Sequence, residues 1–522
     1  MHHCLEITEV ARRIASYMDG ENAYHLAITC KSLLEPCLDK IWWQVDSFEP
    51  LISCLPDDLW LDAGTQPRGN DTVTILDLRR ELNSTDIHRY VTYYAPRTRS
   101  FAFNISEGMR TLSIQALHNL QLLTRCQSGA FSPKLKNFIW GSVDRLVALV
   151  GSDYAQQFFP VLISLFMGKQ VEKFSGVLQP EDPISLKVAV HSGLQICEAS
   201  LREVWIVGGE FAARCLESFS WETLDTLTVH YLNIALLPLL TSPPRLRNLE
   251  MAFSVVSGAP SPHIPTTRPA KSLETFKSLQ SLKISMPKGE LSVRQIFPYI
   301  PRTKALRSLQ WHFGLAHVAA TTCQDFVKAL EEHADRMDLV RMELHSNLWQ
   351  GSQSEALDMD HERIDFSPLQ VFRNLEILSI GLPYTLHVTP AVIADIPICW
   401  PRLRHLHLCP FLSTSCPPSI NHTHILDLSQ RLPGLEALGI QFDATWVTGQ
   451  EGVVGQPSQL RRLHVGRSPI CSPSAVLSLL RSNFPKLKSL RIHYTARPKD
   501  DGLFKERWQA VAEGLEEVQT LP

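Results

Sequence analysis

The sequence is poor in the features that mark secreted proteins, zinc proteins and nucleic-acid-binding proteins. Its twelve cysteines are scattered singly and no C-x-x-C pair occurs, which argues against a disulfide framework and against a zinc ribbon. Lys and Arg number 50 against 53 Asp and Glu, giving a net charge of −3. Nucleic acids and acidic membranes select basic surfaces, so neither is expected as the main partner.

Long apolar runs are also missing. Residues 1–6 carry no signal-peptide apolar stretch. The longest apolar run, residues 158–167, is too short to span a bilayer and contains Pro160. The sequence therefore predicts an intracellular protein of the cytoplasm, the nucleus or both.

Signatures of enzymes are absent as well. The sequence has no Gly-x-Gly-x-x-Gly, no phosphate-binding loop and no His-Glu-x-x-His. Cys409 and His407 stand two apart on a predicted strand, about 6–7 Å from each other, too far for a direct hydrogen bond. The polar residues between 358 and 365 are interpreted as a solvated loop. We expect no enzyme activity, no cofactor and no bound metal.

What the sequence does have is a phrase that returns along most of its length: Leu-x-x-apolar-x-apolar, often with a proline two positions before the leucine. Its first leucines are Leu201, Leu224, Leu246, Leu279, Leu306, Leu339, Leu375, Leu403, Leu435, Leu460 and Leu487. Weaker copies begin at Leu135 and near Phe101, and one more turn between 160 and 195 cannot be registered. A recurring phrase at this spacing is typical of a solenoid, in which each leucine-rich repeat supplies a strand and a return segment.

The phrase also predicts which side chains face the core. Proline ends the preceding helix and favours an extended chain after it. Along the strand the fourth and sixth positions point inward, and the third, fifth and seventh point to the concave face. The return segments show helical spacing. Residues 502–515 place Phe504, Trp508, Val511 and Leu515 on one helical face that would seal the end of the core. Polar loops are expected at 257–270 and 346–365.

Residues 5–43 follow a different pattern. Three short stripes of apolar residues at 3.6-residue spacing predict three helices, and Ser32-x-x-Glu35 matches a capping box before the third. The sequence thus predicts a three-helix module at 1–45, a linker with a connecting helix at 46–96, and an irregular α/β solenoid at 97–522, built as a curved parallel sheet with helical returns.

The N-terminal residues carry a resemblance. The runs Leu5-Glu6-Ile7-Thr8-Glu9-Val10, Leu26-Ala27-Ile28-Thr29-Cys30-Lys31 and Pro36-x-Leu38-Asp39-x-Ile41-Trp42 resemble an F-box. With the repeats behind it, the chain resembles the F-box/leucine-rich-repeat proteins, which are substrate receptors of Skp–cullin–F-box ubiquitin ligases. Residues 85–97 resemble the helix that links the two parts in a fungal-type branch of this group.

The resemblance implies a non-catalytic adaptor. The helices would bind the Skp adaptor and, through it, the cullin. The implied contact set is Leu5, Ile7, Glu9, Val10, Ile14, Leu26, Cys30, Leu38 and Trp42. The family often has proline where this chain has Thr8, which would weaken adaptor binding unless Thr8 serves as an N-cap.

The concave face would hold a protein substrate. Trp and Arg are common binding hot spots, and the histidines there form pairs without the third ligand that zinc needs. The predicted substrate-binding set is Trp205, His312, Arg341, His345, His405, His407, Arg462 and Arg491. The alternative is a repeat scaffold without a ubiquitin link, whose first helices only cap the solenoid.

Overall fold

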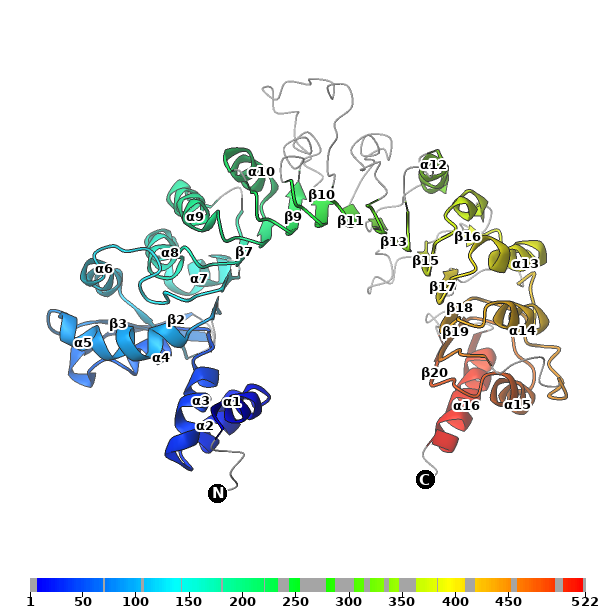
Figure 1. Cartoon of the computed structure of the whole chain (residues 1–522), viewed down its shortest axis with the longest axis horizontal. Coiled ribbons are helices and arrows are strands. Elements are labelled where there is room, and N and C mark those ends of the chain that lie inside the picture. Colours follow the sequence, from blue (N-terminus) through cyan, green and yellow to red (C-terminus); the bar gives the residue numbers. More distant parts are fainter. Residues whose placement is uncertain are drawn as a thin grey trace. The chain divides into compact units, whose positions relative to one another are not determined.

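The computed structural model (Figure 1) describes residues 7–68, 71–104, 108–141, 143–179, 182–219, 221–232, 244–253, 278–286, 305–313, 320–332, 338–346, 363–382, 384–408, 418–451, 458–492 and 501–519. The chain forms two compact units. Unit 1 comprises residues 1–232 and 236–246, and unit 2 comprises 233–235 and 247–522. Over the described residues, no helix combines the length and the apolar character that a membrane crossing requires.

Unit 1 begins with three short helices: α1 (Thr8–Ser16), α2 (Gly20–Ala27) and α3 (Lys31–Ile41). They enclose a small core of Ala11, Ala15, Ala27, Leu33 and Cys37. Two predicted caps are wrong: the residue before α1 is Ile7 and the residue before α3 is Cys30, and neither makes a side-chain cap. The predicted capping box fails because Ser32 lies inside α3 and not at its N-cap, and Glu35 hydrogen-bonds with Tyr93 and Arg97.

Residues 46–96 form more than a linker. The chain passes from α3 directly into β1 (Gln44–Val45), which pairs in parallel with β4 (Ser100–Phe103) and so begins the main sheet. The elements that follow are α4 (Glu49–Ile52), η2 (Asp57–Leu59), the antiparallel pair β2 (Trp60–Arg68) and β3 (Asp71–Leu78), and β5 (Arg110–Leu112), which lies parallel to β3. Residues 84–97 are helical, as α5 (Ser84–Arg89), η3 (Tyr90–Tyr94) and η4 (Ala95–Arg97).

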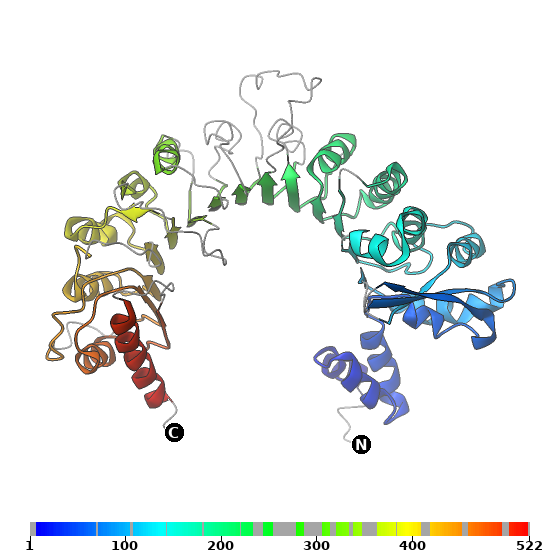
Figure 2. The same ribbon diagram turned by 180° about the vertical axis from the view of Figure 1, so that it is seen from behind.

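The main sheet of unit 1 is parallel and follows the order β1, β4, β6 (Asn137–Trp140), β7 (Lys173–Val177), β8 (Glu203–Val207) and β9 (Thr226–Leu232). The return helices are α6 (Ile114–Leu123), α7 (Val143–Val150), α8 (Ser152–Phe166), α9 (Ile184–Cys197) and α10 (Gly209–Ser218). Figure 2 shows α9 and α10 on one side of the strands, as expected for a repeat in which each strand is followed by a return helix.

Strand β7 belongs to the repeat between residues 160 and 195 whose position the sequence pattern does not give. Its phrase has Val171 and Phe174 in the first and fourth positions but Gly176 in the sixth. A Cβ at Gly176 would lie 2.8 Å from the Trp140 indole of the neighbouring strand. The large Trp140 side chain, fully buried, therefore fills the space of two core residues and removes the apolar signal from the next repeat.

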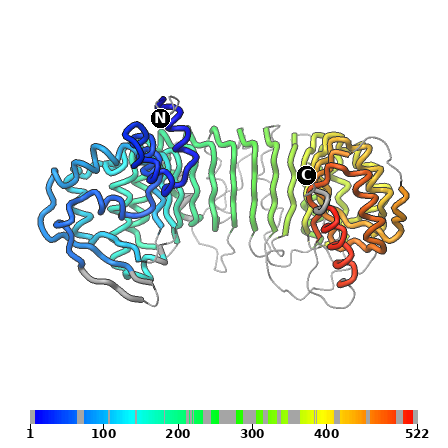
Figure 3. Tube along the Cα trace, turned by 90° about the horizontal axis from the view of Figure 1, so that it is seen from below, coloured from blue at the N-terminus to red at the C-terminus, as the bar shows by residue number. Residues whose placement is uncertain are grey.

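Unit 2 contains a parallel sheet in the order β10 (Asn248–Phe253), β11 (Ser281–Met286), β12 (Ser308–Phe313), β13 (Arg341–Ser346), β15 (Ile377–Gly381), β17 (His405–Leu408), β18 (Ala437–Gly439), β19 (Arg462–Gly466) and β20 (Ser489–Ile492). The fourth positions of successive phrases are register partners, as in Leu282 with Leu309 and Leu309 with Met342. Sixth positions such as Ile284 and Trp311 are buried beside them. Figure 3 shows the strands between residues 278 and 346, drawn in green, lying side by side.

The described returns of unit 2 are α12 (Ala320–Glu331), η9 (Ser367–Val371), α13 (Pro390–Cys399), α14 (His422–Arg431) and α15 (Pro473–Asn483), with the short pair β14 (Arg363–Ile364) and β16 (Thr385–Leu386). Figure 1 shows α12 to α15 on one side of these strands, and the fourth and sixth positions of the strands are buried. The other side, which carries the third, fifth and seventh positions, is called the open face. The predicted parallel sheet with helical returns is confirmed. The predicted polar loops, 257–270 and nearly all of 346–365, lie outside the described residues.

The predicted terminal helix is confirmed as α16 (Asp501–Gln519). Trp508 and Val511 are fully buried, and the Trp508 indole N–H donates a 2.8 Å hydrogen bond to the Ser468 carbonyl. Arg507 reaches the Ile470 carbonyl at 2.9 Å. The helix therefore covers the core beyond β20, where an open solenoid would expose it.

Candidate functional site

The N-terminal helices are the first candidate site. Leu5 lies outside the described residues. Among the other residues of the predicted docking set, Ile7 and Glu9 are exposed, Trp42 is buried, and the rest are half-buried: Val10, Ile14, Leu26, Cys30 and Leu38. Leu26 and Cys30 pack against the small core from its edge. The helices therefore hold most of the predicted set at or near the surface, and only Trp42 lies wholly inside the chain.

Large apolar side chains of the same helices point outward. Tyr17 is 75% exposed, Tyr24 56% and Ile28 66%. The docking set predicted from the sequence missed these three residues. A signal was present: Ala11 and Ala15, like Ala23 and Ala27, recur at a spacing of four and form the inward face. Alanine on the inward face lets helices approach closely and leaves the larger apolar side chains outside.

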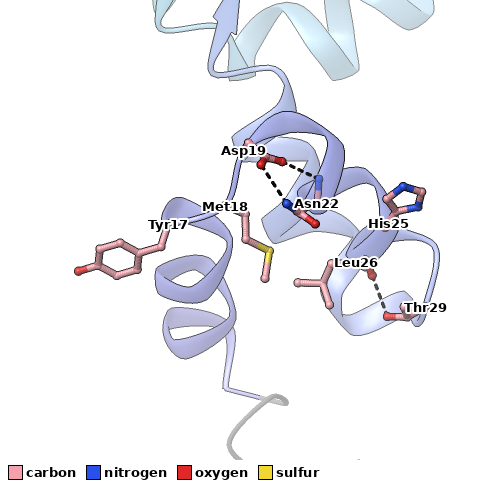
Figure 4. A pocket seen from close by; sticks show the side chains of 7 residues that line it. All are labelled: Tyr17, Met18, Asp19, Asn22, His25, Leu26 and Thr29. Atoms are coloured by element: carbon pink, nitrogen blue, oxygen red, sulfur yellow. Dashed lines mark hydrogen bonds between the residues drawn. The ribbon is translucent and has the colours of Figure 1, made fainter. Parts of the chain in front are cut away.

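An open groove lies between the end of α1 and the outer side of α2 (Figure 4). Its volume is about 440 Å³ and its lining is Tyr17, Met18, Asp19, Asn22, His25, Leu26 and Thr29. Asp19 caps α2 by accepting hydrogen bonds from the Asn22 backbone N–H at 2.8 Å and from its amide at 2.9 Å. These bonds hold the pKa of the Asp19 carboxyl below its usual range. The groove is thus apolar at Met18 and Leu26 and anionic at one end.

Helix α3 is fastened to the connecting helical segment. The Trp42 ring stacks on Tyr94 with centroids 4.5 Å apart and meets Tyr90 edge-on. The Arg97 guanidinium lies 4.5 Å from the Tyr93 ring centre and forms ion pairs with Glu35 and Asp39 of α3. Hydrogen bonds from Tyr93 and Arg97 lower the pKa of Glu35. Because Trp42 serves this junction, we leave it out of the docking surface.

Replacing Arg97 with Ala is expected to loosen this junction. The Arg97 side chain is only 12% exposed. Its loss would leave Glu35 without its ion-pair partner and Asp39 with Arg12 alone, whose Nε lies 3.4 Å from the carboxylate, at a cost of about 2 kcal/mol. Amide hydrogen exchange should then speed up in α3 more than in β6 to β9. R97K should recover part of the protection because lysine keeps the charge but loses the planar fork. R13A, at an exposed arginine of α1, serves as the control. Equal exchange in R97A and R13A would contradict the fastening role.

The open face of unit 2 is the second candidate site. His312 and His345 are register partners on adjacent strands, with ring centroids 5.7 Å apart. The next strand has Gly381 at the matching position, and a Cβ there would lie 2.7 Å from His345 Nδ1. The His345 ring therefore leans over β15, into space that only glycine leaves.

Strand β18 likewise leaves space above it for side chains of its two neighbouring strands. Its described outward residues are Ala437 and Gly439, so side chains of β17 and β19 meet across it. Arg462 Nη2 lies 3.3 Å from His405 Nε2. The rings of His407 and His464 lie 6.3 Å apart above Gly439. The structure therefore brings five of the predicted substrate-binding residues of unit 2 into two groups, His312 with His345, and His405 and His407 with Arg462. The small residues that permit this were not part of the prediction.

His312, His345, His405 and His407 are predominantly neutral at pH 7. Burial lowers the pKa of His312, His345 and His405, and it lowers the pKa of His407 to about 4, with nearby His405 and Arg462 acting in the same direction. In the part of the chain that is described, no three His, Cys, Asp or Glu side chains gather as a group that could hold a metal ion. These histidines thus form a polar, uncharged part of the open face.

His407 should make stability depend on pH. Its pKa is about 4 in the folded chain and about 6.5 in an unfolded one. Between these values the unfolded state binds more protons, so stability is retained above pH 6.5 and falls as the pH drops toward 4, by about 3 kcal/mol at most for this one group. Denaturant midpoints of unit 2 at pH 7 and pH 5 should differ less in H407Q than in the unmodified chain. An unchanged difference would contradict this assignment.

The remaining predicted residues of this set are not part of the two groups. Arg341 pairs with Glu343 of its own strand, with Nε 3.0 Å from the carboxylate. Arg491 is exposed on β20. Trp205 belongs to unit 1, where its ring meets His230 edge-on at 5.6 Å, and it is considered separately from the residues of unit 2. Cys409 and the acidic residues 358–362 lie outside the described residues.

Comparison with known proteins adds little to this geometry. No protein-family model matches the chain, and no curated protein sequence matches it. Among solved structures, a chain of the yeast complex of Rad7 and Elc1 matches with 14% sequence identity, covering 83% of this chain and 93% of that chain, at a TM-score of 0.33. A TM-score this low carries no conclusion about function. The parallel leucine-rich-repeat sheet with helical returns follows from the strand order and the helices of this chain.

Proposed function

We propose that this chain is a non-catalytic substrate-recognition adaptor of a Skp–cullin–F-box ubiquitin ligase. Helices α1 to α3 would be its F-box and bind the Skp adaptor, which connects to the cullin. The open face would hold a protein substrate. The repeats would then act by proximity, since holding a substrate lysine near a charged ubiquitin carrier raises its effective concentration without chemistry on this chain.

The observation that carries the proposal is the composition of the N-terminal module. Its core is built of Ala11, Ala15, Ala27, Leu33 and Cys37, too small to use the larger apolar side chains of the same helices. Tyr17 and Ile28 remain exposed beside the groove residues Met18 and Leu26. Three helices with so small a core are expected to gain stability by covering these side chains with a partner.

The alternative is a repeat scaffold without a ubiquitin link, whose first helices only cap the solenoid. A cap would bury its large apolar side chains against the first strands. Here α1 and α2 lie beside α3 and away from the main sheet (Figure 1), and their inward face is alanine. In the described part of the module, the side-chain contacts with the rest of unit 1 come from α3, through Trp42 and the ion pairs with Arg97. This arrangement favours docking over capping.

The proposal is tested by capture of the purified full chain on immobilised Skp adaptor. Deleting the first 45 residues is a poor comparison, because Trp42 belongs to the core with Tyr90 and Tyr94, and β1 belongs to the main sheet. Single substitutions at exposed positions of α1 and α2 are the matched comparison. If the unmodified chain is not captured, the ubiquitin link fails and the scaffold alternative remains.

A further inference from the structure

One end of the open face in unit 2 carries an excess of positive charge. A charged residue directly precedes each of four neighbouring strands: Arg404 precedes β17, Glu436 precedes β18, Arg461 precedes β19 and Lys488 precedes β20. The backbone N–H groups of Glu436, Arg461 and Lys488 each donate a 2.8 Å hydrogen bond to the carbonyl of the preceding residue in this series. The four residues are therefore joined by one continuous row of backbone hydrogen bonds, and each stands at the start of a different neighbouring strand.

Two further arginines extend this series onto the strands. Arg462 lies on β19, with Nη2 3.3 Å from His405, and Arg491 lies on β20 as the register partner of His464. We call Arg404, Arg461, Arg462, Lys488 and Arg491 the basic edge. All five are exposed.

The acids nearby leave much of this charge unbalanced. Arg404 holds Glu436, whose pKa is lowered by that hydrogen bond. Glu376, on the strand before Arg404, is the other carboxylate of the series. Glu436 also lies within electrostatic reach of Arg461, but its carboxylate is held by Arg404. Among the described residues, Arg461, Lys488 and Arg491 form no ion pair with a carboxylate at contact distance.

The rest of the described open face in unit 2 differs. Lys283 pairs with Glu250 at 2.6 Å, and Arg341 pairs with Glu343 at 2.7 Å. Before β12 the same ladder carries another exposed cation, Arg307, whereas β17–β20 gather the five cations of the basic edge, in a chain whose net charge is −3. Unpaired arginines on a fixed sheet present planar donors to carboxylates at little conformational cost.

We propose that the basic edge binds an acidic stretch of a protein partner, with carboxylates meeting Arg461, Arg462, Lys488 and Arg491 beside the histidine side chains of β17 and β19. This inference rests on the proposed function, because it assigns a chemical class to the substrate of the same open face. A nucleic acid is the less fitting occupant, since the described outward positions of β17–β20 offer no Trp, Tyr or Phe on which bases could stack.

The test measures fluorescence anisotropy of a labelled ten-residue Glu/Asp peptide titrated with the full chain. Binding should weaken with rising salt, because exposed charges are screened. The charge-reversal variant R461E/R462E should weaken binding about tenfold or more. The neutralising variant K488Q/R491Q should weaken binding as well. It replaces the first variant in the test if circular dichroism shows that R461E/R462E is misfolded. The matched control is K328E/K505E, which makes the same charge change at exposed lysines of α12 and α16.

Peptide binding that is lost in both edge variants and kept in the control supports the proposal. Three results overturn it: no binding of the peptide by the unmodified chain, equal weakening in the control, or a single-stranded DNA oligonucleotide of equal charge binding as tightly as the peptide. Capture by the Skp adaptor is measured on the same preparations. If the unmodified chain binds the peptide but is not captured, the ubiquitin link alone is refuted. If it is captured but does not bind the peptide, the basic edge alone is refuted.

Discussion

Replacing Tyr17 with Glu is expected to lower capture by the Skp adaptor about tenfold or more, because a charge would be forced into an apolar contact. The side chain is 75% exposed, and its described neighbours are Arg13, whose guanidinium lies 5.1 Å from the ring centre, and the groove residues. The substitution should therefore leave the helices folded. Binding is measured by surface plasmon resonance with the immobilised adaptor.

The control is Trp446→Glu, which places the same charge at an exposed aromatic residue of unit 2, where the indole is 77% exposed. It should bind the adaptor as tightly as the unmodified chain. A charge at Leu26 is a weaker test, because Leu26 packs against the module's own core and its loss would mix unfolding with lost contact. If Y17E and W446E bind alike, α1 and α2 do not meet the adaptor at this groove.

The repeat phrase predicted the strands wherever each strand brings its own core side chains. Leu309 and Trp311, or Leu406 and Leu408, occupy the positions that the phrase assigns to them, and they are buried. The phrase failed at β7, where the neighbour's Trp140 replaces the missing side chain of Gly176. It also said nothing of β2, β3 and β5, since that small sheet depends on pairing between distant segments, which no local period records.

The sequence pattern also gives only part of each candidate site, because contacts between side chains of different strands and helices leave no local period. Position along the phrase places His312, His345, His405 and His407 on the open face. It cannot say that Gly381 and Gly439 let rings lean across a strand. In the helices, periodicity identifies an apolar side but does not say which of two apolar sides packs inward. Alanine spacing decides this, and it turns Tyr17 and Ile28 outward. Trp42 was assigned to the surface because its partners Tyr90 and Tyr94 lie far along the chain.

Replacing Trp508 with Ala is expected to cost about 3–5 kcal/mol, the usual loss when a buried tryptophan leaves a cavity. The indole is fully buried, packs edge-on near Phe442 and supplies the Ser468 carbonyl with its hydrogen bond. Since each repeat contacts only its neighbours, the damage should stay near the end that α16 covers. Hydrogen exchange should therefore quicken in β18 to β20 and change little in β10 to β12.

Two comparisons separate packing from the hydrogen bond and from tryptophan loss in general. W508F keeps an aromatic ring but loses the N–H donor, so the Ser468 carbonyl gives up its indole partner and about 1–3 kcal/mol should be lost. W446A removes an exposed indole and should change stability by less than about 0.5 kcal/mol. Equal denaturant midpoints for W508A and W446A would mean that α16 does not seal the core. A loss spread evenly from β10 to β20 would mean that unit 2 unfolds as one cooperative block, and the terminal helix would then stabilise the whole open face, including the strands that carry His312 and His345.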